Sequence, residues 1–347
     1  MTTESRDTLH GALRVFLHAP NASLFDALAA RVVAYQAEKL AVYGRLCASR
    51  GGVPQRWQDA PLVPTELFRD IDLCSQPHTE RVFRTSGTTG QAPGTRGYRR
   101  VPDTRLYDAA MTPPFVAHVL AGDPVRRPWL SLIPPASDLP ESSLSHMTSA
   151  LAAQLATEVT WAMRSGGLDL DAARAFLARH DGPVVIMTTS FALVHWLDAN
   201  PETIPLAPGS RMMTTGGFKG KSRTVTEAEL LDGVLRVHGL GMDSVIPEYG
   251  MTELSSQAYG RPLVANPSLR LRVVDPLAHT DVEPGETGLV ACFDLLNLDN
   301  VSAVLTSDLG RLDANGRLTL LGRAPDAIAR GCSLTAEAIL AQSQETP

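Results

Sequence analysis

The residues best suited to chemistry lie in one short segment that combines glycine with hydroxyl side chains: Thr85, Ser86, Gly87, Thr88, Thr89 and Gly90. Glycine allows the backbone to approach a ligand closely and to adopt positive φ. Successive backbone N–H groups can then form a concavity for an anion, with the hydroxyl groups as further donors. The segment lacks the Gly-Lys-Ser/Thr ending of a Walker A loop, so it predicts a phosphate-binding loop of another kind. Alone, it is equally compatible with a polar surface loop.

Two further motifs follow in the chain, Glu248-Tyr-Gly-Met-Thr-Glu253 and Thr306-Ser-Asp-Leu-Gly310. Each has an ordinary structural explanation, with Tyr249 as a core aromatic, Glu253 as a solvated carboxylate and Asp308 as a turn residue. Taken together with the phosphate-binding loop and in this order, however, the three segments resemble the signature set of the adenylate-forming enzymes. That superfamily includes acyl-CoA synthetases, luciferases and nonribosomal adenylation domains.

The resemblance implies a site for the nucleoside of ATP. Tyr249 would stack on adenine, as aromatic faces do with bases. The backbone of Gly216 and Gly217 occupies the place where the superfamily sets main chain against the same base. Asp308 would accept hydrogen bonds from the ribose hydroxyl groups.

The resemblance also implies how the phosphates and a metal ion are held. Thr252 would hydrogen-bond the α-phosphate and take part in catalysis, and Gly250 belongs to the same nucleotide-binding motif. Glu253 would help to hold Mg²⁺, a hard cation that favours carboxylate and phosphate oxygens. Negative charge that develops on the phosphates needs a cation, for which Lys219 is the catalytic candidate; the alternative is an ordinary solvated lysine.

A closer resemblance, to the LuxE-type acyl-protein synthetases of bacterial fatty-acid reductase complexes, rests on three later segments: Thr215-Gly-Gly-Phe-Lys-Gly220, Leu296-Asn-Leu-Asp-Asn-Val301 and Arg330-Gly-Cys-Ser-Leu334. In that family the acyl group leaves the adenylate for a cysteine near the C-terminus and then moves to a reductase subunit. The resemblance implies that Cys332 is this catalytic cysteine, because a thiolate is both a strong nucleophile and a good leaving group. The alternative is a small buried side chain.

The C-terminal region resembles the hinge of larger adenylate-forming enzymes at Arg323, Asp326 and Arg330, and the resemblance places Arg323 at the nucleotide. Those enzymes continue into a lid domain of about 100 residues with a catalytic lysine, a size typical of a small domain. Here the chain stops 24 residues after Arg323 (347 − 323). We therefore expect a core over residues 1–322, a hinge-like tail over 323–347 that carries Cys332, and no separate lid domain.

Hydrophobic periodicity predicts the elements that must position these residues. Residues 24–49 have helical spacing, and Thr224 with Glu227 has the spacing of a capping box at the start of a later helix. Short apolar segments at 129–133, 184–188 and 211–215 alternate with helical segments at 144–158, 169–180, 190–199 and 225–238. This alternation is typical of an α/β fold with a largely parallel sheet. Strands at 271–274, 288–293 and 317–321, joined by turns, predict a smaller and mostly antiparallel β region.

Composition excludes several classes of protein. The net charge of −6 and the absence of any Lys/Arg run argue against a nucleic-acid partner. No apolar run approaches the roughly 18 residues of a membrane span, and the N-terminus lacks the pattern of a signal peptide. The four cysteines are scattered, which predicts neither a disulfide framework nor a zinc site. We expect a cytoplasmic protein.

These observations together predict that the chain activates a carboxylic acid, a fatty acid by the resemblance, with ATP and Mg²⁺. The acyl group would pass to Cys332 and then to an acyl-CoA-reductase-like protein or a carrier thiol. Two alternatives stay open. One is an acyl-CoA ligase of the phenylacetate type, in which coenzyme A replaces Cys332. The other is a subunit that binds nucleotide without catalysis.

Overall fold

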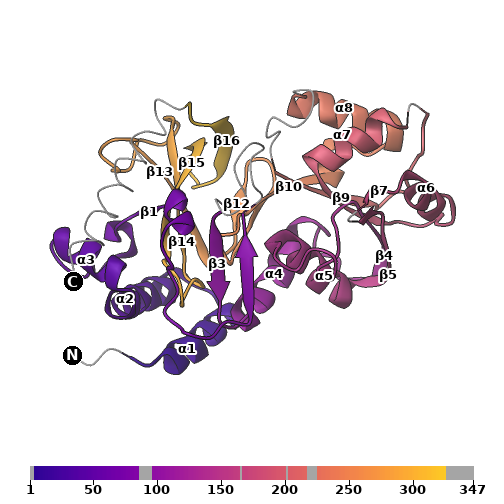
Figure 1. Ribbon diagram of the computed structural model, residues 1–347. Coiled ribbons are helices and arrows are strands. Elements are labelled where there is room, and N and C mark those ends of the chain that lie inside the picture. Colours follow the sequence, from indigo (N-terminus) through magenta and orange to yellow (C-terminus); the bar gives the residue numbers. More distant parts are fainter. Residues whose placement is uncertain (1–3, 86–95, 165, 201, 217–224, 326–347) are drawn as a thin grey trace.

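The computed structural model describes residues 4–85, 96–164, 166–200, 202–216 and 225–325. The two larger sheets of the described residues lie side by side, and each packs against its own set of helices (Figure 1). Within the described residues, no helix is both long enough and apolar enough to cross a membrane.

The larger sheet has seven strands, ordered β12-β11-β10-β9-β8-β4-β5. Its five parallel strands are β4 (Arg127–Ser131), β5 (Ala156–Trp161), β8 (Val185–Thr189), β9 (Arg211–Thr215) and β10 (Val245–Tyr249). The antiparallel strands β11 (Ala258–Tyr259) and β12 (Val264–Ala265) complete it on the β10 side. The three parallel strands predicted at 129–133, 184–188 and 211–215 are confirmed as β4, β8 and β9.

Helices cover both faces of the larger sheet. One face packs on α6 (Leu170–Ala178), α7 (Ser190–Asp198) and α8 (Glu227–His238), which contribute Phe176, Trp196 and Val234 to its core. The other packs on α4 (Arg105–His118) and α5 (Ser143–Leu155), which contribute Phe115 and Leu151. Strands buried on both faces are continuously apolar, which is why they stand out in the sequence.

The smaller sheet confirms the predicted, mostly antiparallel β region. Its strands are β1 (Val63–Pro64), β13 (Leu269–Val274), β14 (Gly288–Asp294), β15 (Ala303–Leu312) and β16 (Leu318–Arg323). Only β1 is parallel to its neighbour, β15. The first three helices pack on this sheet through a shared core: α1 (Arg6–His18), α2 (Ala22–Lys39) and α3 (Ala41–Ser49).

Several smaller elements accompany these two sheets. The hairpin of β2 (Arg81–Arg84) and β3 (Tyr98–Val101) flanks the segment that was predicted to bind phosphate. A second short hairpin is formed by β6 (Met163–Arg164) and β7 (Gly167–Leu168). Three 3₁₀ helices lie at η1 (Trp57–Asp59), η2 (Thr65–Arg69) and η3 (Met242–Ser244).

Three predictions about the helices were wrong in detail. The helix predicted over 24–49 is interrupted at Leu40, whose backbone is extended (φ −107°, ψ 96°). After this interruption α3 packs close to α2 at Gly44. Only glycine fits there, because a Cβ on Gly44 would lie 2.3 Å from the Ala37 carbonyl oxygen. The capping box at α8 uses Thr226 and Glu229 rather than Thr224 and Glu227.

The third error is at residues 156–158, which were assigned to a helix but begin β5. Helix α4, which contains Pro113 and Pro114, was not predicted from the sequence. Proline disfavours a helix interior because it lacks an N–H and crowds the preceding turn. The buried side chains of Met111 and Phe115 on this helix show that tertiary packing outweighs that penalty.

Candidate nucleotide-binding site

The predicted nucleoside residues come together where the two sheets meet. Tyr249 ends β10 of the larger sheet, and its hydroxyl donates a hydrogen bond of 2.9 Å to Oδ2 of Asp308 on β15 of the smaller sheet. Arg323, at the end of β16, forms an ion pair through Nε with Oδ1 of Asp308 at 3.0 Å. The carboxyl ends of parallel strands are the usual ligand-binding edge of an α/β sheet, so this triad lies where a ligand is expected.

Thr252 lies beside Arg84, at the start of the predicted phosphate-binding segment. Its Oγ1 donates to the carbonyl oxygen of Arg84 at 3.4 Å, and Arg84 directly precedes Thr85. The Thr85 N–H donates to the Gly97 carbonyl at 2.8 Å, and Arg96 Nε donates to the Thr85 carbonyl at 2.6 Å. The β2–β3 hairpin therefore brings the first residue of the phosphate-binding segment next to the Thr252 motif.

A buried arginine links this hairpin to the same motif. Arg99 on β3 is 3% exposed, and it donates through Nη1 to the Thr252 carbonyl at 3.4 Å and through Nη2 to Ser255 Oγ at 2.5 Å. Burial lowers the pKa of Arg99, since desolvation disfavours its charged form. The loop after β10 is therefore held from one side by a charged group in the protein interior.

Asp294 holds the same loop from the other side. Its carboxylate is fully buried at the end of β14 and accepts from the N–H groups of Ser255 and Ser256 at 2.7 and 2.8 Å. The Leu296 N–H adds a third backbone hydrogen bond at 3.0 Å. Burial raises the pKa of Asp294 above its ordinary value, although these hydrogen bonds act in the opposite direction.

The candidate metal ligand, Glu253, belongs to this fixed loop. Its carbonyl oxygen accepts from Asn297 Nδ2 at 2.8 Å, and its side chain is only 5% exposed. Within the described ranges, no group of three or more His, Cys, Asp or Glu residues could hold a metal ion without help. A cation bound by Glu253 would therefore share its coordination with other oxygens, which suits a Mg²⁺ ion carried by a polyphosphate.

The end of β9 supplies the remaining described residue of the predicted site. Gly216 has a φ of 75°, a conformation that favours glycine. Its carbonyl oxygen accepts from Ser190 Oγ at 2.6 Å. The residue before it, Thr215, donates through Oγ1 to Oε2 of Glu248 on the neighbouring strand. Burial raises the pKa of Glu248 to about 7.

Several predicted residues lie outside the described part of the chain: Ser86, Gly87, Thr88, Thr89, Gly90, Gly217, Lys219 and Cys332. Of the predicted residues inside it, the structure brings Tyr249, Asp308 and Arg323 into direct contact. Gly250, Thr252 and Glu253 follow Tyr249 on the same loop.

Sequence reasoning missed three supporting residues, Arg99, Glu248 and Asp294. For two of them a signal was present. Glu248 opens the second motif, and Asp294 ends the otherwise uncharged strand segment 288–294. A charged residue at the end of a buried strand is expected to be paired or hydrogen-bonded. No comparable sequence signal distinguished Arg99 from the neighbouring Arg96 and Arg100.

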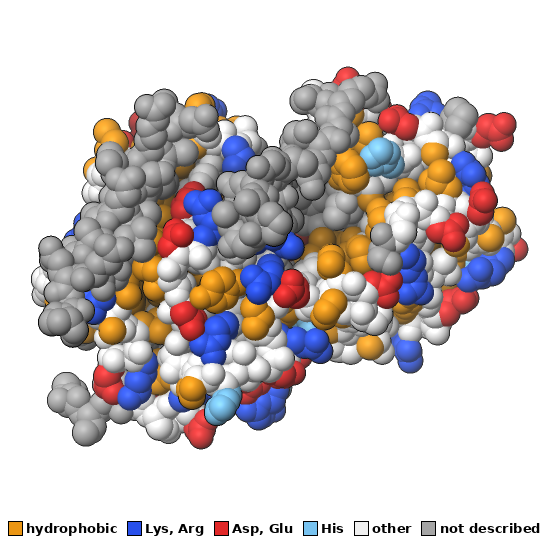
Figure 2. Space-filling model, in the orientation of Figure 1, with side chains coloured by type: hydrophobic (Ala, Val, Ile, Leu, Met, Phe, Trp, Pro, Cys, Tyr) orange, Lys and Arg blue, Asp and Glu red, His pale blue; other side chains and the backbone are white. Residues whose placement is uncertain are grey.

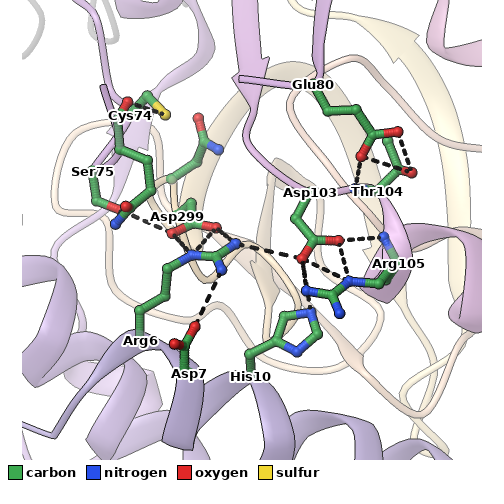
Figure 3. Close-up of polar contacts among 12 residues, drawn as sticks. Arg6, Asp7, His10, Cys74, Ser75, Glu80, Asp103, Thr104, Arg105 and Asp299 are labelled. Carbon is green, nitrogen blue, oxygen red and sulfur yellow. Dashed lines mark hydrogen bonds and ion pairs between the residues drawn. The ribbon is translucent and has the colours of Figure 1, made fainter. Parts of the chain in front are cut away.

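A second polar cluster links α1 to the smaller sheet through ion pairs and hydrogen bonds, and we interpret it as structural (Figure 3). Arg6 forms an ion pair with Asp299 at 2.6 Å, and Asp299 also accepts from Ser75 Oγ at 2.9 Å. Beside it, Asp103 pairs with Arg105 and lies 3.4 Å from His10 Nε2. An open hollow of about 460 Å³ adjoins these groups, and its charged side chains Arg6, Glu80, Asp103 and Arg105 already have partners within the protein: Asp299, Thr104 and each other for the last two.

On the face shown in Figure 2, basic and acidic side chains of the described residues are interspersed, without a broad patch of one sign. This agrees with the net charge of −6.

Solved structures share this fold. No protein-family model and no curated protein matches the chain. ATP-bound MatB from Rhodopseudomonas palustris superposes with a TM-score of 0.50 at 18% identity, over 70% of this chain and 47% of MatB. 2-Hydroxyisobutyryl-CoA ligase in complex with 2-HIB-AMP gives a TM-score of 0.64 at 15% identity, over 87% of this chain and 67% of the ligase. The same ligase in an open conformation, with 2-HIB-AMP and CoA, gives 0.61 at 15% identity, over 85% and 73%.

These likenesses establish the fold. The described residues form the α/β core found in these structures, as the three sequence motifs indicated. The chain spans about half the length of MatB, with 47% of that protein covered. At identities of 15% and 18% the likeness is one of architecture, so activity has to be argued from the site.

Proposed function

We propose that the protein activates a carboxylic acid with ATP, forms an acyl-adenylate and transfers the acyl group to Cys332. The observation that supports this most strongly is the Tyr249–Asp308–Arg323 triad beside the β2–β3 hairpin. In this triad an aromatic ring, a carboxylate that would accept from ribose, and a guanidinium group meet near the carboxyl end of β10. Solved structures of this fold support the proposal further, since MatB was solved with ATP and 2-hydroxyisobutyryl-CoA ligase with 2-HIB-AMP.

In the first step, a carboxylate oxygen of the acid attacks the α-phosphorus of ATP. A new P–O bond forms, the bond to the β,γ-phosphates breaks, and pyrophosphate leaves. Residues 85–90 and Thr252 would hold the phosphates, and Lys219 would stabilise their developing charge. Glu253 would hold Mg²⁺, which neutralises phosphate charge when bound.

In the second step, the thiolate of Cys332 attacks the acyl carbon. A C–S bond forms, the C–O bond to AMP breaks, and AMP leaves with the electron pair. The described cysteines are poor candidates for this role. Burial raises the pKa of Cys47 to about 11 and also raises the pKa values of Cys74 and Cys292, which keeps them as thiols at neutral pH. The acyl group would then pass from Cys332 to an acyl-CoA-reductase-like protein or a carrier thiol, and a fatty acid is the substrate that the LuxE-type resemblance suggests.

The first step is tested by ATP–pyrophosphate exchange over a panel of carboxylic acids. We expect exchange that depends on one class of acid and on Mg²⁺. ATP binding without exchange for any acid would contradict the proposal and favour a nucleotide-binding subunit.

The second step is tested by mass spectrometry after incubation with ATP and the accepted acid. We expect an acyl adduct that hydroxylamine removes. The adduct should be absent from Cys332→Ala, which should keep exchange activity, and present in the matched control Cys74→Ala. Turnover that requires coenzyme A and survives Cys332→Ala would instead identify an acyl-CoA ligase of the phenylacetate type.

A further inference from the structure

A small cavity lies between helix α1 and the loop that carries Thr252. Its volume is about 20 Å³, and its walls come from α1, β3, α4 and the loops that follow β10 and β14. It adjoins the open hollow described above, because Arg6 and Asp103 line both. Figure 3 shows the side that α1 contributes, with Arg6 directed at Asp299 and His10 at Asp103. A space of this size can hold one water molecule, which needs about 10–15 Å³.

Two residues that line this cavity each have a buried polar atom without a hydrogen-bond partner in the described part of the chain. The atoms are Nε of Arg99, a residue that is 3% exposed, and Nε2 of His10, which is 6% exposed. Asp103 comes within 3.4 Å of His10 Nε2, but this contact does not have the geometry of a hydrogen bond. Buried polar atoms are nearly always bonded to protein or to ordered water, so these two indicate a further partner.

The guanidinium group of Arg99 is held on one side only. Its Nη1 donates to the Thr252 carbonyl and its Nη2 to Ser255 Oγ, which leaves the N–H of Nε. A charge in the protein interior is costly unless its hydrogen bonds are satisfied. An acceptor inside the cavity would therefore complete the hydrogen bonding of this buried charge.

The charges around the cavity favour a neutral ligand. The charged side chains that line it cancel formally: Arg6, Arg99, Asp103 and Asp299. Burial lowers the pKa of His10 below its ordinary value, although Asp103 acts in the opposite direction, so His10 is neutral at pH 7. Its Nε2 then accepts or donates one hydrogen bond, depending on the tautomer. A water molecule suits both tautomers, whereas an anion would add a charge that nothing on the cavity wall balances.

We propose that this cavity holds one ordered water molecule, which accepts a hydrogen bond from Arg99 Nε and forms a second one with His10 Nε2. The carboxylates of Asp103 and Asp299 at the cavity wall offer an acceptor for a third bond, and about three bonds are typical of buried water. The water links α1 to Arg99 and, through Arg99, to the backbone of Thr252. This link does not depend on the proposed function.

A crystal structure of the full chain at high resolution tests the site directly. We expect one water peak within about 2.7–3.2 Å of both Arg99 Nε and His10 Nε2. No density at this position, or a protein side chain bonded to Arg99 Nε, would overturn the proposal. A chloride ion there, recognised by its anomalous scattering, would overturn it as well, because the site would then bind a charged ligand.

A double-variant cycle tests the bridge in solution. Among the described residues, no hydrogen bond or ion pair joins His10 directly to Arg99, so coupling between them has to pass through the water. His10→Phe and Arg99→Met should each lower the midpoint of urea denaturation. The double variant should lose less than the sum of the two, because the bridge is lost only once. Additive losses would overturn the proposal.

The histidine variants keep the test decisive if Arg99→Met does not fold, as judged by circular dichroism. His10→Gln retains a polar end that can bond to the water, so its midpoint should lie between those of His10→Phe and the wild type. The matched control is His18→Phe, which should leave the midpoint unchanged because His18 is exposed at the end of the same helix. A His10→Phe variant at least as stable as the wild type would overturn the proposal, since only an unbonded nitrogen can be removed without loss.

Discussion

Replacing Glu248 by glutamine should make the protein more stable, and increasingly so as the pH rises. Burial raises the pKa of this carboxyl from 4.5 to about 7 in the folded protein, whereas an unfolded chain exposes it to water. The folded state therefore binds the extra proton between these values, and stability falls as the pH increases through this window. Above pH 7 the folded protein has to keep a buried carboxylate with one donor, Thr215.

The size of the effect follows from the two pKa values. Their difference of about 2.5 corresponds to about 3 kcal/mol, at 1.36 kcal/mol per pKa unit. Linkage places about 1 kcal/mol of this cost at pH 5 and about 3 kcal/mol at pH 8. Glutamine at position 248 carries no charge at either pH. The gap in unfolding free energy between Glu248→Gln and wild type should therefore widen by roughly 2 kcal/mol from pH 5 to pH 8.

Urea denaturation of both proteins at half-unit pH intervals measures this gap, and urea leaves the ionic strength unchanged. Glu202→Gln should show no comparable widening, because Glu202 is exposed. A gap that is constant from pH 5 to pH 8 would refute the reasoning, since it would mean that Glu248 titrates as a solvated carboxyl. A gap that narrows would show that the folded state prefers the charged form, and hence that a cation lies against it.

Three further changes test the geometry of the site. Gly250→Ala should destabilise the protein by about 1–3 kcal/mol through overpacking against Glu248 Oε1. Adding Glu248→Ala should remove this overpacking, so the double variant should lose less stability in urea denaturation than the sum of the two single variants. Additive losses would show that the two residues are not in contact. Asp294→Ala should lower the free energy of unfolding by about 3 kcal/mol or more, because the buried N–H groups of Ser255 and Ser256 lose their acceptor. A loss under 1 kcal/mol would show that these N–H groups find other acceptors. Tyr249→Phe should cost about 1 kcal/mol through the lost hydrogen bond to Asp308, and an unchanged midpoint would mean that this bond does not form in solution.

The sequence predicted the elements whose signal is local. Strands β4, β8 and β9 are continuous apolar segments between helices, and their burial on both faces explains that pattern. The break at Leu40 left no such mark, because an extended residue between two helices depends on how α3 packs against α2. In α4 the prolines gave a misleading local signal, which the burial of Phe115 outweighed.

The site could be predicted only as far as its motifs reach. Tyr249, Thr252 and Asp308 were identified because each belongs to a motif that resembles known nucleotide sites. The contact between Tyr249 and Asp308 depends on how two sheets are placed, which residue spacing does not encode. Arg99 and Asp294 act through backbone groups of a loop far from them in the chain, so their roles became visible only with the hydrogen bonds in place.

The packing of α1, α2 and α3 on strands far away in the sequence has a consequence for folding during translation. These helices are translated before their core partners on β13 to β15. Between the end of α3 at Ser49 and the start of β13 at Leu269, 220 residues (269 − 49) have to be translated. At about 5–20 residues per second this takes roughly 10 to 45 s. During that interval the apolar sides of the three helices can be covered only in part, by one another and by earlier core residues such as Phe68 and Leu106, while the larger sheet can already form. The nascent chain is therefore most exposed to aggregation at its N-terminal end, and its final folding step is the closure of the first helices on the last strands.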